Sequence, residues 1–86
     1  MSHLESSECI ARIRALLTEL RFLTSASAVG DAASLFDAAV LDSLRLMELI
    51  PLLEQQFSIR VAVEDLTPDN FDSLTSISRY VMERRA

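Results

Sequence analysis

The 86-residue sequence predicts an all-α fold, a four-helix bundle with three long helices and one short helix in a single domain. Apolar residues recur at spacings of three and four over two long stretches, which is the period of one face of a helix. The chain contains one glycine and two prolines, too few turn residues for a fold of many short strands. Half of its residues are hydrophobic, enough for a core without a metal ion or disulfide.

The first predicted helix extends from about residue 5 to about residue 23, after a loose start over residues 1–4. Three serines near its beginning are alternative N-caps, and the sequence does not distinguish among Ser2, Ser6 and Ser7. The helix has one apolar stripe, formed by Ile10, Ile13, Leu16, Leu17, Leu20 and Leu23.

A long connecting loop is predicted next, because residues 24–34 are mostly small or polar and include the only glycine. The apolar pair Leu35 and Phe36 follows it. We expect this pair to hold the loop against the core, since both side chains are too apolar to be left in water.

The second predicted helix runs from about Asp42 to Phe57. Asp42 is the expected N-cap, because its carboxylate can accept from the N–H of Leu44 or Arg45. Pro51 removes one backbone hydrogen bond, at a cost of about 3 kcal/mol, and predicts a kink, the alternative being two short helices. The predicted buried face consists of Leu46, Leu49, Ile50, Leu53 and Phe57. The predicted outer face consists of Leu44, Met47, Glu48, Pro51 and Gln55.

The remainder predicts a connector and two further helices. Residues 58–63 alternate like a strand but have no partner strand, so we expect an extended connector. Its apolar side chains Ile59, Val61 and Val63 are expected to cover the helices. Thr67-Pro68 predicts a short helix from Pro68 to Phe71. Asp72 or Ser73 then caps a final helix that ends near Arg84. The predicted core comprises Ile13, Leu20, Leu49, Leu53, Phe57, Leu74, Ile77 and Val81.

The charge distribution bounds the class of partner. The net charge is −5, and residues 31–72 hold nine acidic residues against two arginines. This argues against a nucleic-acid partner and favours a partner protein with a basic docking face, the alternative being a merely soluble surface.

The single cysteine, Cys9, fits a reducing compartment. No stretch resembles a signal peptide or a membrane span, so we expect a cytoplasmic protein without a membrane partner.

The sequence offers no catalytic machinery. The only histidine is His3, in the predicted loose start, so a Ser-His-Asp arrangement around Ser43 is not expected. The carboxylates of residues 64–72 lack the spacing and the turn glycine of a calcium loop, and predict a solvated face. We therefore expect a substrate of enzymes and not an enzyme.

The stretch Leu35–Phe57, LFDAAVLDSLRLMELIPLLEQQF, carries a longer pattern. Leu-Phe-Asp precedes the tripeptide Asp42-Ser43-Leu44, Glu-Leu-Ile follows it, and Leu-Glu-Gln-Gln-Phe-Ser-Ile closes the helix. A serine beside an aspartate at a helix start is usually only part of a cap. In this combination, however, the chain resembles the acyl and peptidyl carrier proteins from about Leu35 to Val81.

The resemblance implies that the chain folds as an acyl-carrier-like helical bundle. It also implies that the chain is a phosphoprotein. Ser43 would bear a 4′-phosphopantetheine arm taken from coenzyme A, with Asp42 in a supporting role. The thiol of that arm would hold an acyl or aminoacyl group as a thioester. Implied partners are a phosphopantetheinyl transferase, an acyl- or amino-acid-activating ligase and a downstream transferase, and we expect a monomer. The competing interpretation is a small acidic helical interaction module without a prosthetic group.

Some residues match the family and others depart from it. Leu44, Met47, Glu48 and Glu54 match positions that carriers use for docking. Arg45 stands where fatty-acid carriers usually have an acid, which predicts selectivity among partners. Ala39 stands where similar carriers often have glycine, and a positive φ there would cost on the order of 1 kcal/mol. The segment Glu64–Phe71 and the Leu41-Asp42 pair look more like D-alanyl and stand-alone aminoacyl or peptidyl carriers, which favours an amino acid or specialised acyl cargo.

Overall fold

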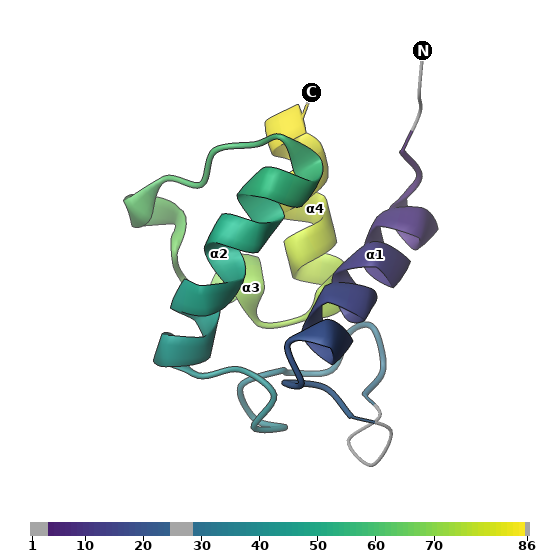
Figure 1. Ribbon diagram of the computed structural model, residues 1–86, viewed down its shortest axis with the longest axis vertical. Helices are drawn as coiled ribbons and strands as arrows, with labels where there is room; N and C mark the ends of the chain where they lie inside the picture. Colours follow the sequence, from purple (N-terminus) through teal and green to yellow (C-terminus); the bar gives the residue numbers. More distant parts are fainter. Residues whose placement is uncertain (1–3, 25–28, 86) are drawn as a thin grey trace.

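The computed structural model describes residues 4–24 and 29–85. Within those residues the only regular secondary structure is helical, which confirms the predicted fold class of three long helices and one short one (Figure 1). The elements are α1 (Ser6–Glu19), α2 (Ser43–Phe57), the single 3-10 turn η2 (Val63–Asp65), α3 (Pro68–Phe71) and α4 (Leu74–Arg85).

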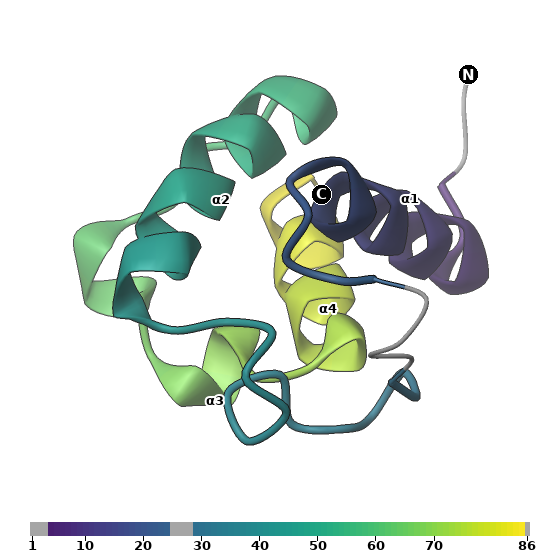
Figure 2. The ribbon, with the colours of Figure 1, turned by 60° about the horizontal axis from the view of Figure 1, so that its bottom comes forward.

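One of the three long helices runs opposite to the other two. In Figure 1, α1 runs downward while α2 and α4 run upward, so α1 and α2 are antiparallel as predicted. The most extensive packing between helices joins α1 to α4. Figure 2 shows the loop before α2 passing the ends of α4 and α3 on its way to the first turn of α2. This route brings the chain to Ser43 across one end of the bundle.

The core confirms most of the predicted burial. All five apolar residues of the predicted inner face of α2 are buried. The predicted core residues of α1 and α4 are also buried, with one exception. Leu20 is only half-buried, because α1 has already ended at Glu19 and Leu20 is its C-cap. The fully enclosed large side chains include Ile13, Leu17, Leu35, Leu49, Leu53, Phe71, Leu74 and Ile77.

The end of α1 differs from the prediction, which placed it near Leu23. Arg21 has a φ of 65°, and its N–H bonds to the carbonyl of Thr18. The N–H of Phe22 bonds back to the carbonyl of Leu17 at 3.0 Å, which completes a Schellman turn. The apolar spacing hid this end, because the turn still carries Leu23 into the core.

The start of α1 also differs. Glu5 is the N-cap and makes no side-chain cap bond, so the prediction of Ser6 or Ser7 as the cap was wrong. The alternative cap, Ser2, lies outside the described residues, as do the first three residues of the predicted loose start. Its last residue, Leu4, packs against the core, which corrects the prediction there.

The second helix follows its prediction closely. Asp42 is the N-cap, and its Oδ1 accepts from the N–H of Arg45 at 2.8 Å. Helix α2 continues through Pro51, so the alternative of two short helices was wrong. Pro51 is exposed, as expected for the outer face. The helix ends where Ser58 turns into the left-handed region at φ 55°.

Beyond α2, one predicted contact fails. Ile59 is buried and Val61 packs partly against the core, but Val63 is 82% exposed. The strand-like alternation of apolar and polar residues ends at Val63, because this residue begins the unpredicted turn η2 and its side chain is exposed to solvent.

Helix α3 has its predicted bounds, although the Thr67 side chain makes no cap bond. The cap of α4 is Ser73, whose Oγ accepts from the N–H of Ser76 at 3.0 Å.

Candidate functional site

Ser43 is the first residue of α2 and is exposed. Its hydroxyl makes no hydrogen bond with any residue that the structure describes. Asp42 engages the N–H of Arg45, while the N–H groups of Ser43 and Leu44 bond to nothing in the described chain. A phosphate ester on the Ser43 oxygen would therefore stand in solvent, beside free N–H donors at the positive end of the helix dipole. These residues fit a phosphate-linked group.

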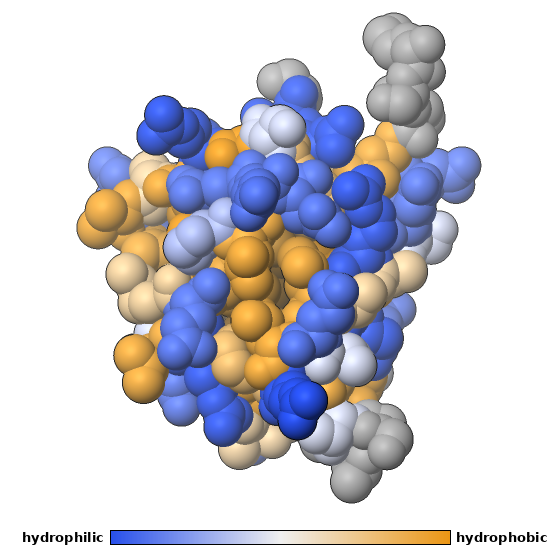
Figure 3. All heavy atoms as spheres, viewed as in Figure 1, coloured by the Kyte–Doolittle hydropathy of each residue, from blue (hydrophilic) through white to orange (hydrophobic). Residues whose placement is uncertain are grey.

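An exposed face of α2 begins at this serine. Leu44 is 71% and Met47 57% exposed, although both are large apolar residues. Glu48 is exposed and pairs with no cation in the described residues. Both ribbon views place η2, with its exposed Val63, beside α2 (Figures 1 and 2). Figure 3 shows apolar atoms along this side of the molecule with hydrophilic side chains around them.

Arg45, predicted to face partners, has contacts within the chain. Its Nη1 donates to the carbonyl of Ala39 at 2.9 Å and to that of Val40 at 3.4 Å. The guanidinium carbon lies 5.4 Å from the centre of the Phe22 ring. Its Nε is 4.0 Å from Oδ2 of Asp42, a loose ion pair. Arg45 therefore contacts the segment after α1, the turn before α2 and the helix cap at once.

Glu54, also predicted to dock partners, holds the connector to α2. Its Oε2 accepts from the N–H of Val61 at 2.9 Å. At a rise of 1.5 Å per residue, Glu54 lies about 16 Å along the helix from Ser43. Of the predicted docking residues, Leu44, Met47 and Glu48 are thus close to Ser43 and unengaged by the described residues, whereas Glu54 is distant and bonded.

The long loop is fixed at its end by Asp72. The carboxylate accepts from Ser34 Oγ at 2.8 Å and from the N–H of Phe36 at 3.1 Å. The Asp72 carbonyl accepts from the N–H of Leu35 at 2.6 Å. As predicted, Leu35 is buried and holds the loop against the core. The alternative of Asp72 as the cap of α4 was wrong, because its carboxylate is committed to the loop.

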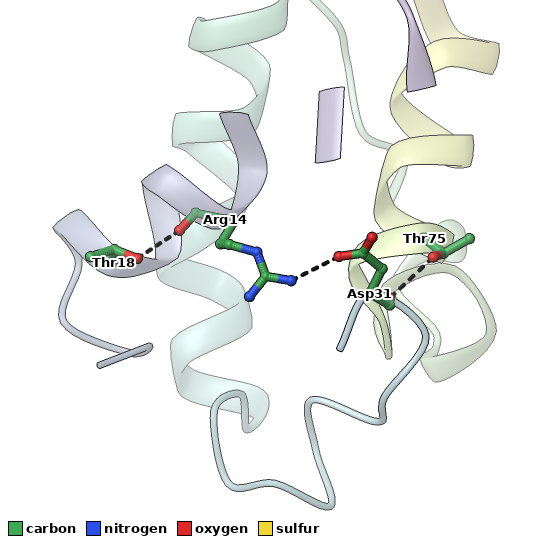
Figure 4. Close-up of polar contacts among 4 residues, drawn as sticks. All are labelled: Arg14, Thr18, Asp31 and Thr75. Atoms are coloured by element: carbon green, nitrogen blue, oxygen red, sulfur yellow. Dashed lines mark hydrogen bonds and ion pairs between the residues drawn. The ribbon is translucent and has the colours of Figure 1, made fainter. Parts of the chain in front are cut away.

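A second anchor lies nearer the middle of the loop (Figure 4). Asp31 pairs with Arg14 of α1 at 2.7 Å. The Asp31 carbonyl accepts both the N–H and the hydroxyl of Thr75, at 3.0 and 3.1 Å. The loop thereby joins the first turn of α4 to α1. Sequence reasoning missed both anchors, because neither aspartate stands at a recognisable spacing from its partners.

The turn before α2 contains a left-handed residue. Ala39 has a φ of 61°, the conformation for which glycine is favoured. The carbonyl of Leu35 accepts the N–H groups of Val40 and Leu41 at 2.9 and 3.1 Å, and all three side chains are buried. The chain therefore reaches Asp42 through a tight turn closed by its own backbone.

The acidic segment of residues 64–72 is not the uniformly solvated face that was expected. Asp65 is half-buried and accepts the Tyr80 hydroxyl at 2.7 Å. Burial of the phenol and this hydrogen bond raise the pKa of Tyr80.

No group of three potential metal ligands occurs among the residues that the structure describes. In the same residues, no helix is long and apolar enough to cross a membrane.

Comparison with known proteins gives the family. The family model described as phosphopantetheine attachment site matches residues 11–81. The D-alanyl carrier protein of Streptococcus pyogenes serotype M5 (strain Manfredo) is 45% identical over 49 residues, 57% of this chain and 62% of that protein. Those of Streptococcus sanguinis (strain SK36) and Streptococcus gordonii (strain Challis) are each 39% identical over 75 residues, 87% of this chain and 92% of the relative.

The matched region contains Ser43, the whole of α2 and α3, and the turn before α2. It favours the carrier interpretation over that of an interaction module without a prosthetic group. The chain therefore belongs to the phosphopantetheine-attachment family of carrier proteins: it is a carrier and not an enzyme, and it holds its cargo as a thioester on a covalent 4′-phosphopantetheine arm.

Proposed function

We propose that Ser43 is the residue that bears the arm. The observation that carries this proposal is the exposed Ser43 hydroxyl at the start of α2, without a partner among the described residues. In the reaction, the serine oxygen bonds to the pantetheine-side phosphorus of coenzyme A. The bond from that phosphorus to the nucleotide half breaks, and the hydroxyl proton passes to a base. The described part of the chain offers Ser43 no such base, so the transferase supplies it.

Asp42 supports this serine without taking part in the bond changes. Its carboxylate is held by the N–H of Arg45 and fixes the first turn of α2. Because the cap comes from Asp42, the helix keeps its start whether the Ser43 oxygen is free or esterified.

The cargo we propose is an amino acid, with D-alanine as the first candidate. Support comes from the relatives, which are named D-alanyl carrier proteins. Family membership implies a phosphopantetheinyl transferase and enzymes that load and unload the arm. The finer proposal is an amino-acid-activating ligase that forms the thioester in the cytoplasm, where the free thiol of buried Cys9 persists.

We further propose that these partners dock on the outer face of α2, at Leu44, Met47 and Glu48, acting on a monomer. Arg45 and Glu54 border this face, but their charged groups already bond within the chain. A small acidic and apolar patch suits a brief encounter, because the carrier must leave one enzyme to reach the next.

Intact-mass spectrometry after incubation with a broad-specificity transferase and coenzyme A tests the attachment. The wild-type chain should gain one phosphopantetheine group and Ser43→Ala none, while the exposed-serine control Ser58→Ala should behave as wild type. Modification of Ser43→Ala would refute the site. Absence of modification of the wild-type chain would favour an interaction module.

A loading assay tests the cargo. The modified chain, an amino-acid-activating ligase, ATP and D-alanine should give a thioester that hydroxylamine cleaves. Loading by a fatty acid in preference to every amino acid supplied would refute the aminoacyl proposal, while leaving the attachment site intact.

A further inference from the structure

The contacts of Arg45 suggest a role different from partner docking. Its Nη1 is the donor to two successive carbonyls, those of Ala39 and Val40, at 2.9 and 3.4 Å. Neither carbonyl accepts another hydrogen bond from the described residues. The backbone of this turn reverses at Ala39, which is in the left-handed region. Arg45, which lies on α2, then binds the carbonyls of the turn.

Arg45 is itself held at several points. Its N–H bonds to Asp42 at 2.8 Å, and its guanidinium lies over the Phe22 ring at 5.4 Å. A planar guanidinium can stack on a ring and donate in its own plane at the same time. The side chain thus connects three segments: the residues after α1, the turn at 39–40 and the first turn of α2.

Ser43 lies between the points that Arg45 joins. It follows Val40 by three residues and precedes Arg45 by two. Its own hydroxyl makes no hydrogen bond with the described residues that could orient it. The direction of its hydroxyl therefore depends on the backbone, which the arginine fixes on both sides.

We propose that Arg45 is a positioning residue for arm attachment: its guanidinium locks the 39–42 turn to α2 and so sets the orientation in which Ser43 meets the transferase. This rests on the proposed role of Ser43. Phosphoryl transfer requires the attacking oxygen in line with the bond that breaks, and a misplacement of about 1 Å can cost about 10²-fold in rate. A loosened turn therefore lowers kcat, whereas loss of a docking charge raises KM.

The test compares Arg45→Lys with Arg45→Gln, using Arg60→Gln as the control. Lysine keeps the charge but cannot hold both carbonyls and cover the Phe22 ring. Arg60 is exposed beyond the far end of α2, so its glutamine variant removes the same charge away from the turn. Transferase kinetics give kcat and KM for each chain. Amide hydrogen exchange on the unmodified proteins reports the turn itself, independently of the enzyme.

Both Arg45 variants should lower kcat by about tenfold with KM within about twofold of wild type. Exchange at residues 39–43 should be faster in both, and Arg60→Gln should match wild type in each measurement. Wild-type kcat in Arg45→Lys, or a raised KM in Arg45→Gln alone, would overturn the positioning role. Unchanged exchange at residues 39–43 would also overturn it. A wild-type chain left unmodified at Ser43 would refute the proposed function, and this inference with it.

Discussion

Substitution of Ala39 by glycine should stabilise the protein. Ala39 is exposed and has a φ of 61°, so its Cβ stands in the left-handed region at a cost of about 1–2 kcal/mol. Glycine removes that cost but makes the unfolded chain more flexible, which offsets about 0.4–1 kcal/mol. The net gain should be on the order of 1 kcal/mol, a rise in Tm of about 4–8 °C for a domain of this size.

Ala38 provides the matched control, because it is exposed in the same turn and its φ is not positive. Ala38→Gly should lower Tm through the entropy of the unfolded chain alone. Thermal unfolding followed by circular dichroism measures the Tm of both variants. If Ala39→Gly destabilised the protein as much as Ala38→Gly, the left-handed geometry assigned to this turn would be refuted.

Three further predictions concern the core, the pH dependence and the docking face. Phe57→Ala should lower the free energy of unfolding by about 3–5 kcal/mol, because this ring is 2% exposed in the core. The raised pKa of Tyr80 means that the folded state holds the phenol proton more tightly than the unfolded state. The contribution of this proton to the free energy of unfolding is fully present below pH 10.0 and is lost as pH rises through the folded-state pKa. The protein should therefore become less stable at alkaline pH, and this loss should be smaller in Tyr80→Phe. Glu48→Arg should slow arm attachment, and wild-type attachment should weaken as salt rises.

Each of these predictions has a contrary outcome. A loss below about 1 kcal/mol for Phe57→Ala would show that its site collapses or that the buried face of α2 is misassigned. Tyr80 is the only tyrosine, so its phenolate absorbance can be followed directly. Titration at the usual tyrosine pKa would contradict both the burial of the phenol and its hydrogen bond to Asp65. Attachment rates indifferent to both Glu48 and salt would place docking elsewhere on the molecule.

The sequence predicted those parts of the fold that repeat along the chain. The period of the apolar residues gave the inner face of α2, and the Asp42 cap and the Thr67-Pro68 pair gave two helix starts. The end of α1 was missed, because Arg21 provides the left-handed turn where a glycine would have signalled it. Val63 was wrongly predicted to cover the helices, because the alternation of apolar and polar residues does not show where the extended connector ends and the turn η2 begins.

For the candidate site, sequence reasoning identified Ser43, its cap and the exposed face, all of which depend on neighbours within one helix. It did not find the anchors of the preceding loop. Asp31 and Asp72 meet partners 17 to 44 residues distant along the chain, and only the folded arrangement brings them together. The same holds for Arg45, whose contact with Phe22 crosses the whole loop.

Peptide-level localisation of the arm tests the central claim most directly. Trypsin cleaves after arginine, so residues 22–45 form one peptide that contains Ser43 together with Ser25, Ser27 and Ser34. After reaction with coenzyme A and a transferase, fragmentation of this peptide should place the phosphopantetheine on Ser43 alone. An arm on any other serine, or a peptide 22–45 that remains unmodified while the transferase modifies a known carrier in the same reaction, would contradict the assignment of Ser43 as the carrier's attachment site.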